Sequence, residues 1–232
     1  SLPQWRDRFH QGTVSTWAIV RFAGCYLLAM IVSTFVNVAF YHEIMRSLAG
    51  ERVSLPSGLS FAASRIRTIL AWSLFASSVG LILQLVSERL GGIGRFALRF
   101  IGVTWSVAAT FVIPVIIREE QTNPLRLLQA STATIKKTWG ETVLGFVGLQ
   151  SAPVILLAGV GLLLAVQVSD WTTDNYWIVM GMAGLLFFFL QTAVYIVGAV
   201  YRCALYVYAT EGVIPEPYNA ELMDSAWSVK KR

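Results

Sequence analysis

The sequence has few charged side chains and keeps them out of its long apolar stretches. Only 13% of the 232 residues are Asp, Glu, Lys or Arg, about half the share that is usual in a soluble domain. Five runs contain no charged residue, and they cover residues 22–42, 68–87, 100–117, 142–169 and 175–201. A helix needs about 20 apolar residues to cross a bilayer core about 30 Å thick, so each run is long enough. The composition therefore excludes an ordinary water-soluble domain.

The continuity of these runs selects the type of membrane structure. Backbone polar groups in hydrocarbon must bond to one another, which leaves α-helices or a closed barrel, and barrel strands would give about ten-residue segments of alternating polarity. We therefore predict an all-α fold, a polytopic transmembrane helical bundle with cytoplasmic amphipathic in-plane helices. Within a transmembrane domain of residues 17–209, the expected spans are 17–42, 66–87, 96–117, 142–168 and 176–203, with an in-plane helix at 123–139.

The two ends of the chain fall outside this domain. Residues 1–16 are expected to form an outer-side segment and residues 210–232 a cytoplasmic C-terminal tail. The chain begins at Ser1 without an initiator Met, and residues 2–12 do not have the apolar character of a signal peptide. We therefore expect a trimmed or processed chain, with five spans in this fragment and a sixth, upstream span in the full protein.

Cysteine and histidine are scarce, with two of each. Cys25 and Cys203 lie in or beside apolar runs, where small buried residues are the expected role rather than a disulfide or a metal site. His42 and Glu43 resemble the start of a zinc-protease helix, but that helix needs a second imidazole four positions after the first, and it is absent. We predict no metal site and no cofactor.

Motifs for catalysis are also missing. The sequence has no nucleophile elbow, no Gly-rich phosphate loop, no Cys-x-x-Cys pair and no intramembrane aspartate motif. Glu119 and Glu120 are adjacent acids, which we expect to be surface charges after the third helix. We therefore expect no catalytic residue and no enzyme activity.

The basic residues indicate an orientation in the membrane rather than nucleic-acid binding. Twelve Lys and Arg lie in residues 43–67, 118–141 and 202–232, and six lie on the other side. Residues 170–174 carry two Asp and no basic residue, and aromatic side chains typical of an interface surround them. We expect this loop and residue 1 outside, and the C-terminus on the cytoplasmic side of a bacterial inner membrane.

The segment before the fourth run has the pattern of a helix that lies in the interface. Asn123 is a good N-cap, and Pro124 suits the first helical position. The apolar face is predicted to contain Leu125, Leu128, Thr132, Ile135 and Trp139. The opposite face contains Arg126, Lys136 and Lys137, a candidate lipid or partner face, with simple interfacial anchoring as the alternative. A similar Pro-initiated stretch at residues 56–72 suggests a repeated unit.

The apolar runs carry amides in place of charges. Asn37, Gln150 and Gln191 fall about 4–8 Å to the cytoplasmic side of the midplane and could share one intramembrane polar layer. Hydrogen bonds that fix the rotation of neighbouring helices are one account of this layer, and a polar pocket open to the cytoplasm is the other. Pro114 and Pro153 are expected to bend the third and fourth helices near this level.

Several stretches between Phe35 and Thr142 resemble an uncharacterised family of bacterial and archaeal six-helix integral membrane proteins. They are Asn37, Arg46, Leu48-Ala-Gly-Glu-Arg-Val, Leu70-Ala-Trp, Ser87-Glu-Arg-Leu, Trp105-Ser, Pro114-Val and Lys137-Thr-Trp-Gly-Glu. More loosely, Asn123-Pro-Leu-Arg-Leu-Leu-Gln-Ala-Ser is similar to the membrane domain of some glycerophosphodiester phosphodiesterases. The resemblance implies the fold and an additional first helix, but no activity.

Two functions are consistent with these observations. The first is a non-catalytic scaffold or accessory subunit that binds protein partners or lipid. The second is a transporter or lipid-handling carrier that uses the layer of Asn37, Gln150 and Gln191. In either case we expect membrane lipids as partners, together with other membrane proteins or a second copy of the chain, and no nucleic acid.

Overall fold

The computed structural model describes residues 16–137 and 173–212, and these residues are helical, with no strand among them. This confirms the predicted all-α fold class. The helices in chain order are α2 (Thr16–Leu48), α3 (Leu55–Ser64), α4 (Ile66–Arg89), α5 (Gly92–Ala108), α6 (Val112–Arg118), α7 (Pro124–Lys137) and α9 (Thr173–Glu211).

Four stretches of the described residues are long and apolar enough to cross a membrane. They are Val20–Leu48, Ile66–Ser87, Gly94–Arg118 and Gly181–Glu211. These stretches overlap the first, second, third and fifth expected spans. The fourth expected span, 142–168, lies outside the described residues. The chain is therefore a multi-pass helical membrane protein.

The first and last of these helices continue beyond the charge-free runs. α2 ends at Leu48 instead of near residue 42, and α9 ends at Glu211 instead of near residue 203. Arg46 consequently lies inside α2, and Arg202 lies nine residues before the end of α9 instead of next to it. The reason is that Arg has a high helix propensity, so one charged side chain does not end a helix.

The third span consists of two helices, α5 and α6, which are joined at residues 109–111. Pro114 lacks an N–H group and its ring crowds the preceding turn, so the helix is interrupted just before it, where the sequence predicted only a bend. Ser131 of α7 bonds to the backbone on both sides of the break. Its hydroxyl donates to the Ala108 carbonyl over 2.6 Å and accepts from the Phe111 N–H over 3.1 Å. α7 therefore fixes the joint in the third span.

The α7 helix begins where it was predicted, because the Asn123 side-chain oxygen accepts a hydrogen bond of 2.9 Å from the Leu125 N–H. Its buried face differs from the predicted one, however. Leu125 is 56% exposed. The buried residues are Leu127, Ser131, Thr134 and Ile135. α7 packs against α4, α5, α6 and α9, so contacts within the protein determine which side is covered.

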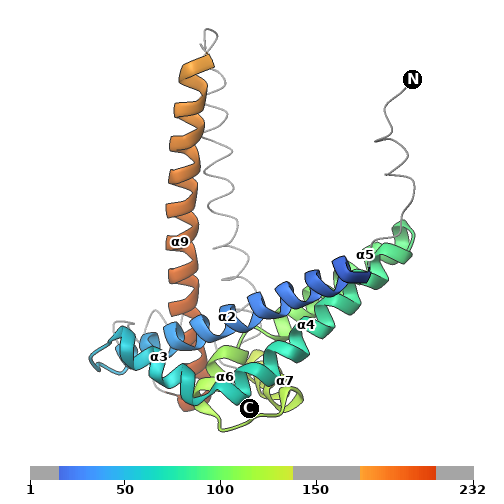
Figure 1. Ribbon diagram of the computed structural model, residues 1–232. Helices are drawn as coiled ribbons and strands as arrows, with labels where there is room; N and C mark the ends of the chain where they lie inside the picture. The colour runs from blue at the N-terminus through green and yellow to red at the C-terminus, as the bar shows by residue number, and fades with distance from the viewer. Residues whose placement is uncertain (1–15, 138–172, 213–232) are drawn as a thin grey trace, which may run out of the picture.

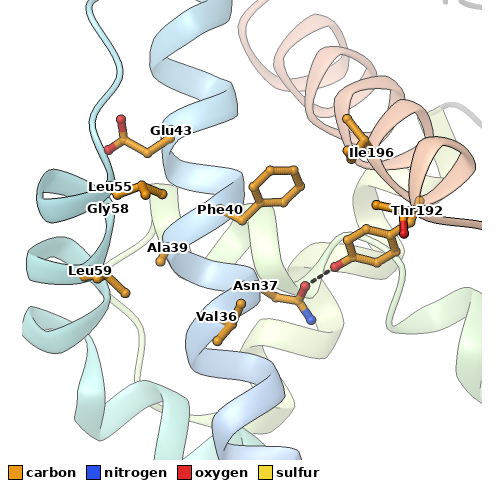
Figure 2. A pocket seen from close by; sticks show the side chains of 11 residues that line it. Val36, Asn37, Ala39, Phe40, Glu43, Leu55, Gly58, Leu59, Thr192 and Ile196 are labelled. Atoms are coloured by element: carbon orange, nitrogen blue, oxygen red, sulfur yellow. Dashed lines mark hydrogen bonds between the residues drawn. The ribbon is translucent and has the colours of Figure 1, made fainter. Parts of the chain in front are cut away.

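The α3 helix crosses α2 at close range. Ser54 caps α3, and its side chain accepts from the Ser57 N–H. A Cβ atom added to Gly58 would lie only 2.7 Å from the Ala39 carbonyl oxygen of α2, so glycine allows this close contact (Figure 2). The contact holds α3 along the C-terminal part of α2.

Short helices gather at one end of the molecule (Figure 1). From this end α2, α4 and α5 extend in one direction and α9 in another (Figure 1). The ion pairs here include Arg46–Glu51 at 2.8 Å and Arg118–Glu211 at 2.9 Å. We call this region the charged end.

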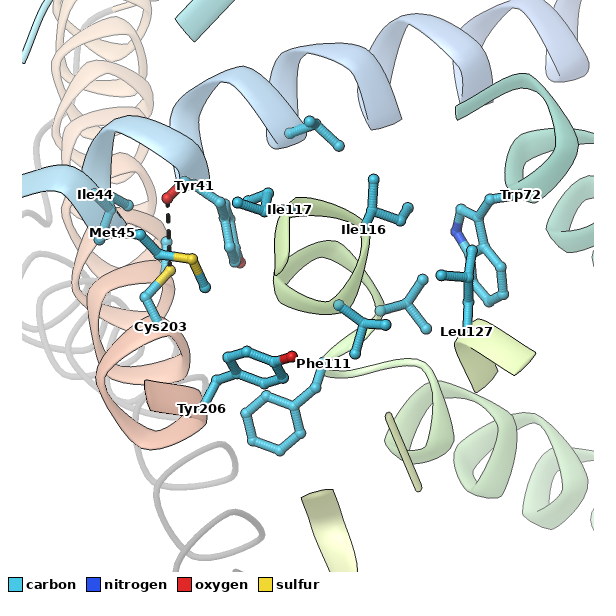
Figure 3. Packing of buried hydrophobic residues seen from close by; sticks show 14 of the residues in the cluster. Tyr41, Ile44, Met45, Trp72, Phe111, Ile116, Ile117, Leu127, Cys203 and Tyr206 are labelled. Carbon is cyan, nitrogen blue, oxygen red and sulfur yellow. Dashed lines mark hydrogen bonds between the residues drawn. The ribbon is translucent and has the colours of Figure 1, made fainter. Parts of the chain in front are cut away.

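The hydrophobic core lies next to the charged end, around α6. Figure 3 shows the side chains of Tyr41 of α2, Trp72 of α4 and Tyr206 of α9 around this short helix, close to its own Ile116 and to Phe111 at its start. Phe111 and Ile116 are fully buried there. The remaining fully buried residues with large side chains include Val38, Ile69, Val115, Leu127 and Leu205. The core thus joins α2, α4, α6, α7 and the C-terminal half of α9.

Candidate functional site

A groove with a volume of about 420 Å³ lies between α2, α3 and α9, where α9 diverges from the other helices. Its surface is almost entirely apolar. The side chains that line it include Val36 and Phe40 of α2, Leu55 and Leu59 of α3, and Thr192 and Ile196 of α9 (Figure 2). Because α2 and α9 are both long enough to cross a membrane, the groove is of the kind that an extended hydrocarbon chain fits.

One hydrogen bond connects two walls of the groove. The Tyr195 hydroxyl of α9 donates to the Asn37 side-chain oxygen of α2 (Figure 2). Asn37 also donates to the Ser33 hydroxyl over 3.5 Å, and the Tyr195 ring stacks on Phe40 with 6.3 Å between ring centroids. Asn37, predicted from the sequence as a polar intramembrane residue, therefore faces α9 at the edge of the groove.

The two predicted glutamines are positioned differently. Gln191 lies one turn before Tyr195 on α9, and its side-chain oxygen is buried without a hydrogen-bond partner among the described residues. Gln150 lies outside the described residues. Tyr195, which the sequence analysis did not single out, is the residue that contacts Asn37. A shared layer of Asn37, Gln150 and Gln191 stays a prediction.

Arg202 was also missed as a candidate, because it was counted only among the basic residues of the cytoplasmic side. In the structure it lies within α9, and its guanidinium carbon is 5.7 Å from the centroid of the Tyr41 ring on α2. The sequence contains a signal for this arrangement. Gln191, Tyr195, Gly198 and Arg202 are spaced by four, three and four residues, which places them on one face of a helix.

His42, Glu43 and Arg46, the residues of the incomplete metal motif, hold the turn between α2 and α3. The Glu43 carboxylate accepts from the Ser54 N–H over 2.6 Å. Arg46 donates to Glu51 over 2.8 Å and to the Ser57 hydroxyl over 2.7 Å. His42 stacks on Phe61 at 3.8 Å between centroids. A polar cavity of about 440 Å³ lies beside these three residues. Their side chains are already engaged in the hydrogen bonds, ion pairs and ring contact described above, so their role is structural.

The remaining candidates lie on the surface near the charged end. Arg126, Lys136 and Lys137 are exposed on α7, and the Lys137 amine donates to the Ala209 carbonyl of α9 over 3.4 Å. Glu120 is 90% exposed and lies 3.7 Å from Arg65. In the part of the chain that the structure describes, no group of three or more His, Cys, Asp or Glu side chains is arranged to hold a metal ion.

The profile of a family of unknown function, DUF6159, matches residues 16–215, which is most of the chain. This agrees with the expected resemblance to an uncharacterised membrane-protein family. No curated protein and no solved structure matches the chain. The looser resemblance to the membrane domain of glycerophosphodiester phosphodiesterases is not shown by these matches.

Proposed function

The chain belongs to the family of unknown function DUF6159, and we propose that it is a non-catalytic membrane protein whose groove between α2, α3 and α9 binds the hydrocarbon chain of a lipid. In this role it acts as a scaffold or accessory subunit for other membrane components. The observation that carries the proposal is the apolar groove of about 420 Å³ between two membrane-spanning helices.

The composition of the groove supports a lipid as its ligand. Leu55, Leu59 and Ile196 offer only hydrocarbon, and the polar atoms of Asn37 and Tyr195 are bonded to each other. The carboxylate of Glu43 points away from the groove toward the start of α3 (Figure 2). A substrate with many polar groups would find few partners here, whereas a hydrocarbon chain would leave no polar group unsatisfied.

The charged end supports an orientation. It contains Arg46, Arg118 and Lys137, and it belongs to the side of the chain that carries twelve of the basic residues. By the positive-inside rule this side is cytoplasmic, in a bacterial inner membrane. The exposed Arg126 and Lys136 would then meet anionic lipid or a protein partner at the cytoplasmic surface.

A lipid-handling carrier is the second candidate, and the buried, unpartnered Gln191 oxygen favours it. Buried polar groups without partners are uncommon and call for an explanation. A carrier would use Asn37, Gln150 and Gln191 to pass polar ligands, so replacing all three with Leu would abolish lipid exchange between vesicles. A scaffold would keep its assembly and its bound lipid after the same replacement.

Photo-crosslinking tests the groove directly. The protein is reconstituted into nanodiscs of phosphatidylethanolamine with a diazirine on the acyl chain, and labelled residues are mapped by mass spectrometry. We expect labels to be concentrated on Phe40, Leu59 and Ile196. Uniform labelling of the groove and of exposed residues such as Leu185 and Phe188, which are 62% and 65% exposed, would contradict the proposal.

A matched pair of variants gives the control. Ile196→Trp fills the groove, whereas Val197→Trp puts the same bulk on the neighbouring residue, which is 54% exposed and does not line the groove. We expect the first variant to lower labelling of Phe40 and Leu59 severalfold and the second to leave it unchanged.

A further inference from the structure

A seam of polar residues continues from the groove along the contact between α2 and α9. On α9 it consists of Gln191, Tyr195, Gly198 and Arg202, and on α2 it consists of Asn37 and Tyr41. Tyr195 bonds to Asn37, and Arg202 lies over the ring of Tyr41. The described residues contain two buried side-chain polar atoms without a partner, the Gln191 oxygen and the Arg202 Nε. Both belong to this seam.

Arg202 lies deep in its helix. It is nine residues before Glu211, or about 13 Å along the helix axis from that residue. Its guanidinium also turns back over Gly198, since Nη2 is 3.9 Å from the position that a Cβ atom of Gly198 would occupy. Gly198 precedes Arg202, so the side chain is directed toward the N-terminal part of α9 and away from Glu211.

The described residues provide no carboxylate partner for Arg202. The charge-free runs, including 142–169, contain no Asp or Glu. Glu43, two residues after Tyr41, is engaged by Ser54, His42 and Arg46. Arg202 is partly exposed, but its Nε is buried without a hydrogen-bond partner among the described residues. A cation within a membrane-spanning helix is costly unless an anion pairs with it, so this N–H is available to an anionic ligand.

We propose that Arg202 binds the phosphate of an anionic lipid whose acyl chain occupies the groove. This inference rests on the proposed function and adds the class of the head group. The order of the contacts along α9 matches the shape of a lipid, because Arg202 is nearer the charged end and Thr192 and Ile196 are nearer the middle of the helix. Arg202 is partly exposed, so a head group can reach it. Its planar fork of N–H donors suits two phosphate oxygens at once.

Native mass spectrometry of the detergent-solubilised protein tests this inference. Phosphatidylglycerol and a diacylglycerol with identical chains, which lacks the phosphate, are titrated separately, and inorganic phosphate is added as a competitor. We expect the wild type to prefer phosphatidylglycerol by about tenfold, the size of one charge-assisted hydrogen-bond pair. Arg202→Gln should abolish the preference, and Arg202→Lys should keep part of it. The control Arg95→Gln removes an exposed positive charge on α5 and should change nothing.

The outcomes separate this inference from the proposed function. Equal binding of the two lipids by the wild type, with both weakened by Ile196→Trp, would overturn the role of Arg202 and leave the groove as a lipid site. Absence of binding of either lipid would overturn both. Displacement of phosphatidylglycerol by millimolar inorganic phosphate would assign the site to free phosphate instead of a lipid. The two lipids are compared first on the wild-type protein. A variant that fails to fold therefore does not prevent the inference from being contradicted.

Discussion

The core around α6 differs from α5 and from the N-terminal part of α9, which extend away from it and which we call the two arms. The core and the arms contain similar side chains in different surroundings. Phe111, beside α6, is fully buried, whereas Phe100 on α5 and Phe188 on α9 are 71% and 65% exposed. The arms are nevertheless as apolar as the core, because lipid replaces protein as their environment. Hydrophobicity alone therefore does not reveal which face of a membrane helix contacts protein.

Small polar side chains distinguish the two regions better. Ser73 of α4 donates to the Thr34 hydroxyl of α2 over 3.1 Å, and both residues are buried. Ser131 bonds to two backbone groups of the third span. In the arms, by contrast, Thr104, Ser106 and Thr192 bond to carbonyls of their own helices. A hydroxyl that bonds to another segment marks a contact between segments.

The largest expected effect comes from truncating matched phenylalanines in the two regions. Phe111→Ala should lower the free energy of unfolding by about 3–5 kcal/mol, because it leaves a cavity in the core. Phe100→Ala should lower it by about 0.5 kcal/mol or less, since lipid fills the space. Titration with a denaturing detergent measures both. Equal losses would show that the arms are as tightly packed as the core.

A pair of glycines tests close packing against open space. Gly58→Ala places a Cβ atom against the Ala39 carbonyl and should cost about 1–3 kcal/mol. Gly102→Ala in α5 meets no atom within 4 Å and should stabilise the helix by about 0.5–1 kcal/mol. Thermal unfolding in detergent provides the measurement. The same sign for both changes would contradict the close α2–α3 crossing.

Removing a hydroxyl should matter only where it bonds to another segment. Ser131→Ala leaves the Phe111 N–H and the Ala108 carbonyl without a partner at the break and should cost about 1–2 kcal/mol. Ser106→Ala removes a bond to Gly102 within α5 and should be nearly neutral. Hydrogen exchange at residues 109–111 should rise only in the first variant. Unchanged exchange there would show that α7 does not stabilise the joint.

The smallest effect concerns the hydrogen bond between Tyr195 and Asn37, which joins α9 to α2 at the groove. A double-mutant cycle with Asn37→Leu and Tyr195→Phe should give a coupling energy of about 0.6–1.7 kcal/mol. Unfolding of the two single variants and the double variant supplies the cycle. Strict additivity would mean that the contact contributes nothing to holding α9 against α2.

Much of the fold follows from local signals in the sequence. The charge-free runs predicted the spans, Asn123 and Pro124 predicted the start of α7, and Pro114 predicted a bend in the third span, where the helix is interrupted. Each of these signals acts within a few residues of itself, through the cost of charge in lipid, an N-cap or a missing N–H group. They could therefore be read without knowing the tertiary structure.

The contacts between segments could not be predicted in the same way. The buried face of α7 is centred on Leu127 and Ser131 because of the helices that it meets, and an apolar periodicity shifted by one residue is nearly as good in sequence. At the candidate site, Asn37 was predicted, but its partner Tyr195 and the nearby Arg202 were not. The last charge-free run ends at residue 201 and the expected span ended at residue 203, so Arg202 was placed at the end of a helix that continues to Glu211.

The joint in the third span has a consequence for biosynthesis. α6 has only seven residues, too few to be a stable helix alone. The hydroxyl that accepts from the Phe111 N–H at its start belongs to Ser131, thirteen residues beyond its end. During translation the third span therefore remains unfinished until Ser131 has left the ribosome. Nascent chains stalled before and after this residue should differ in protease protection near Phe111, and identical protection would show that the span matures independently of α7.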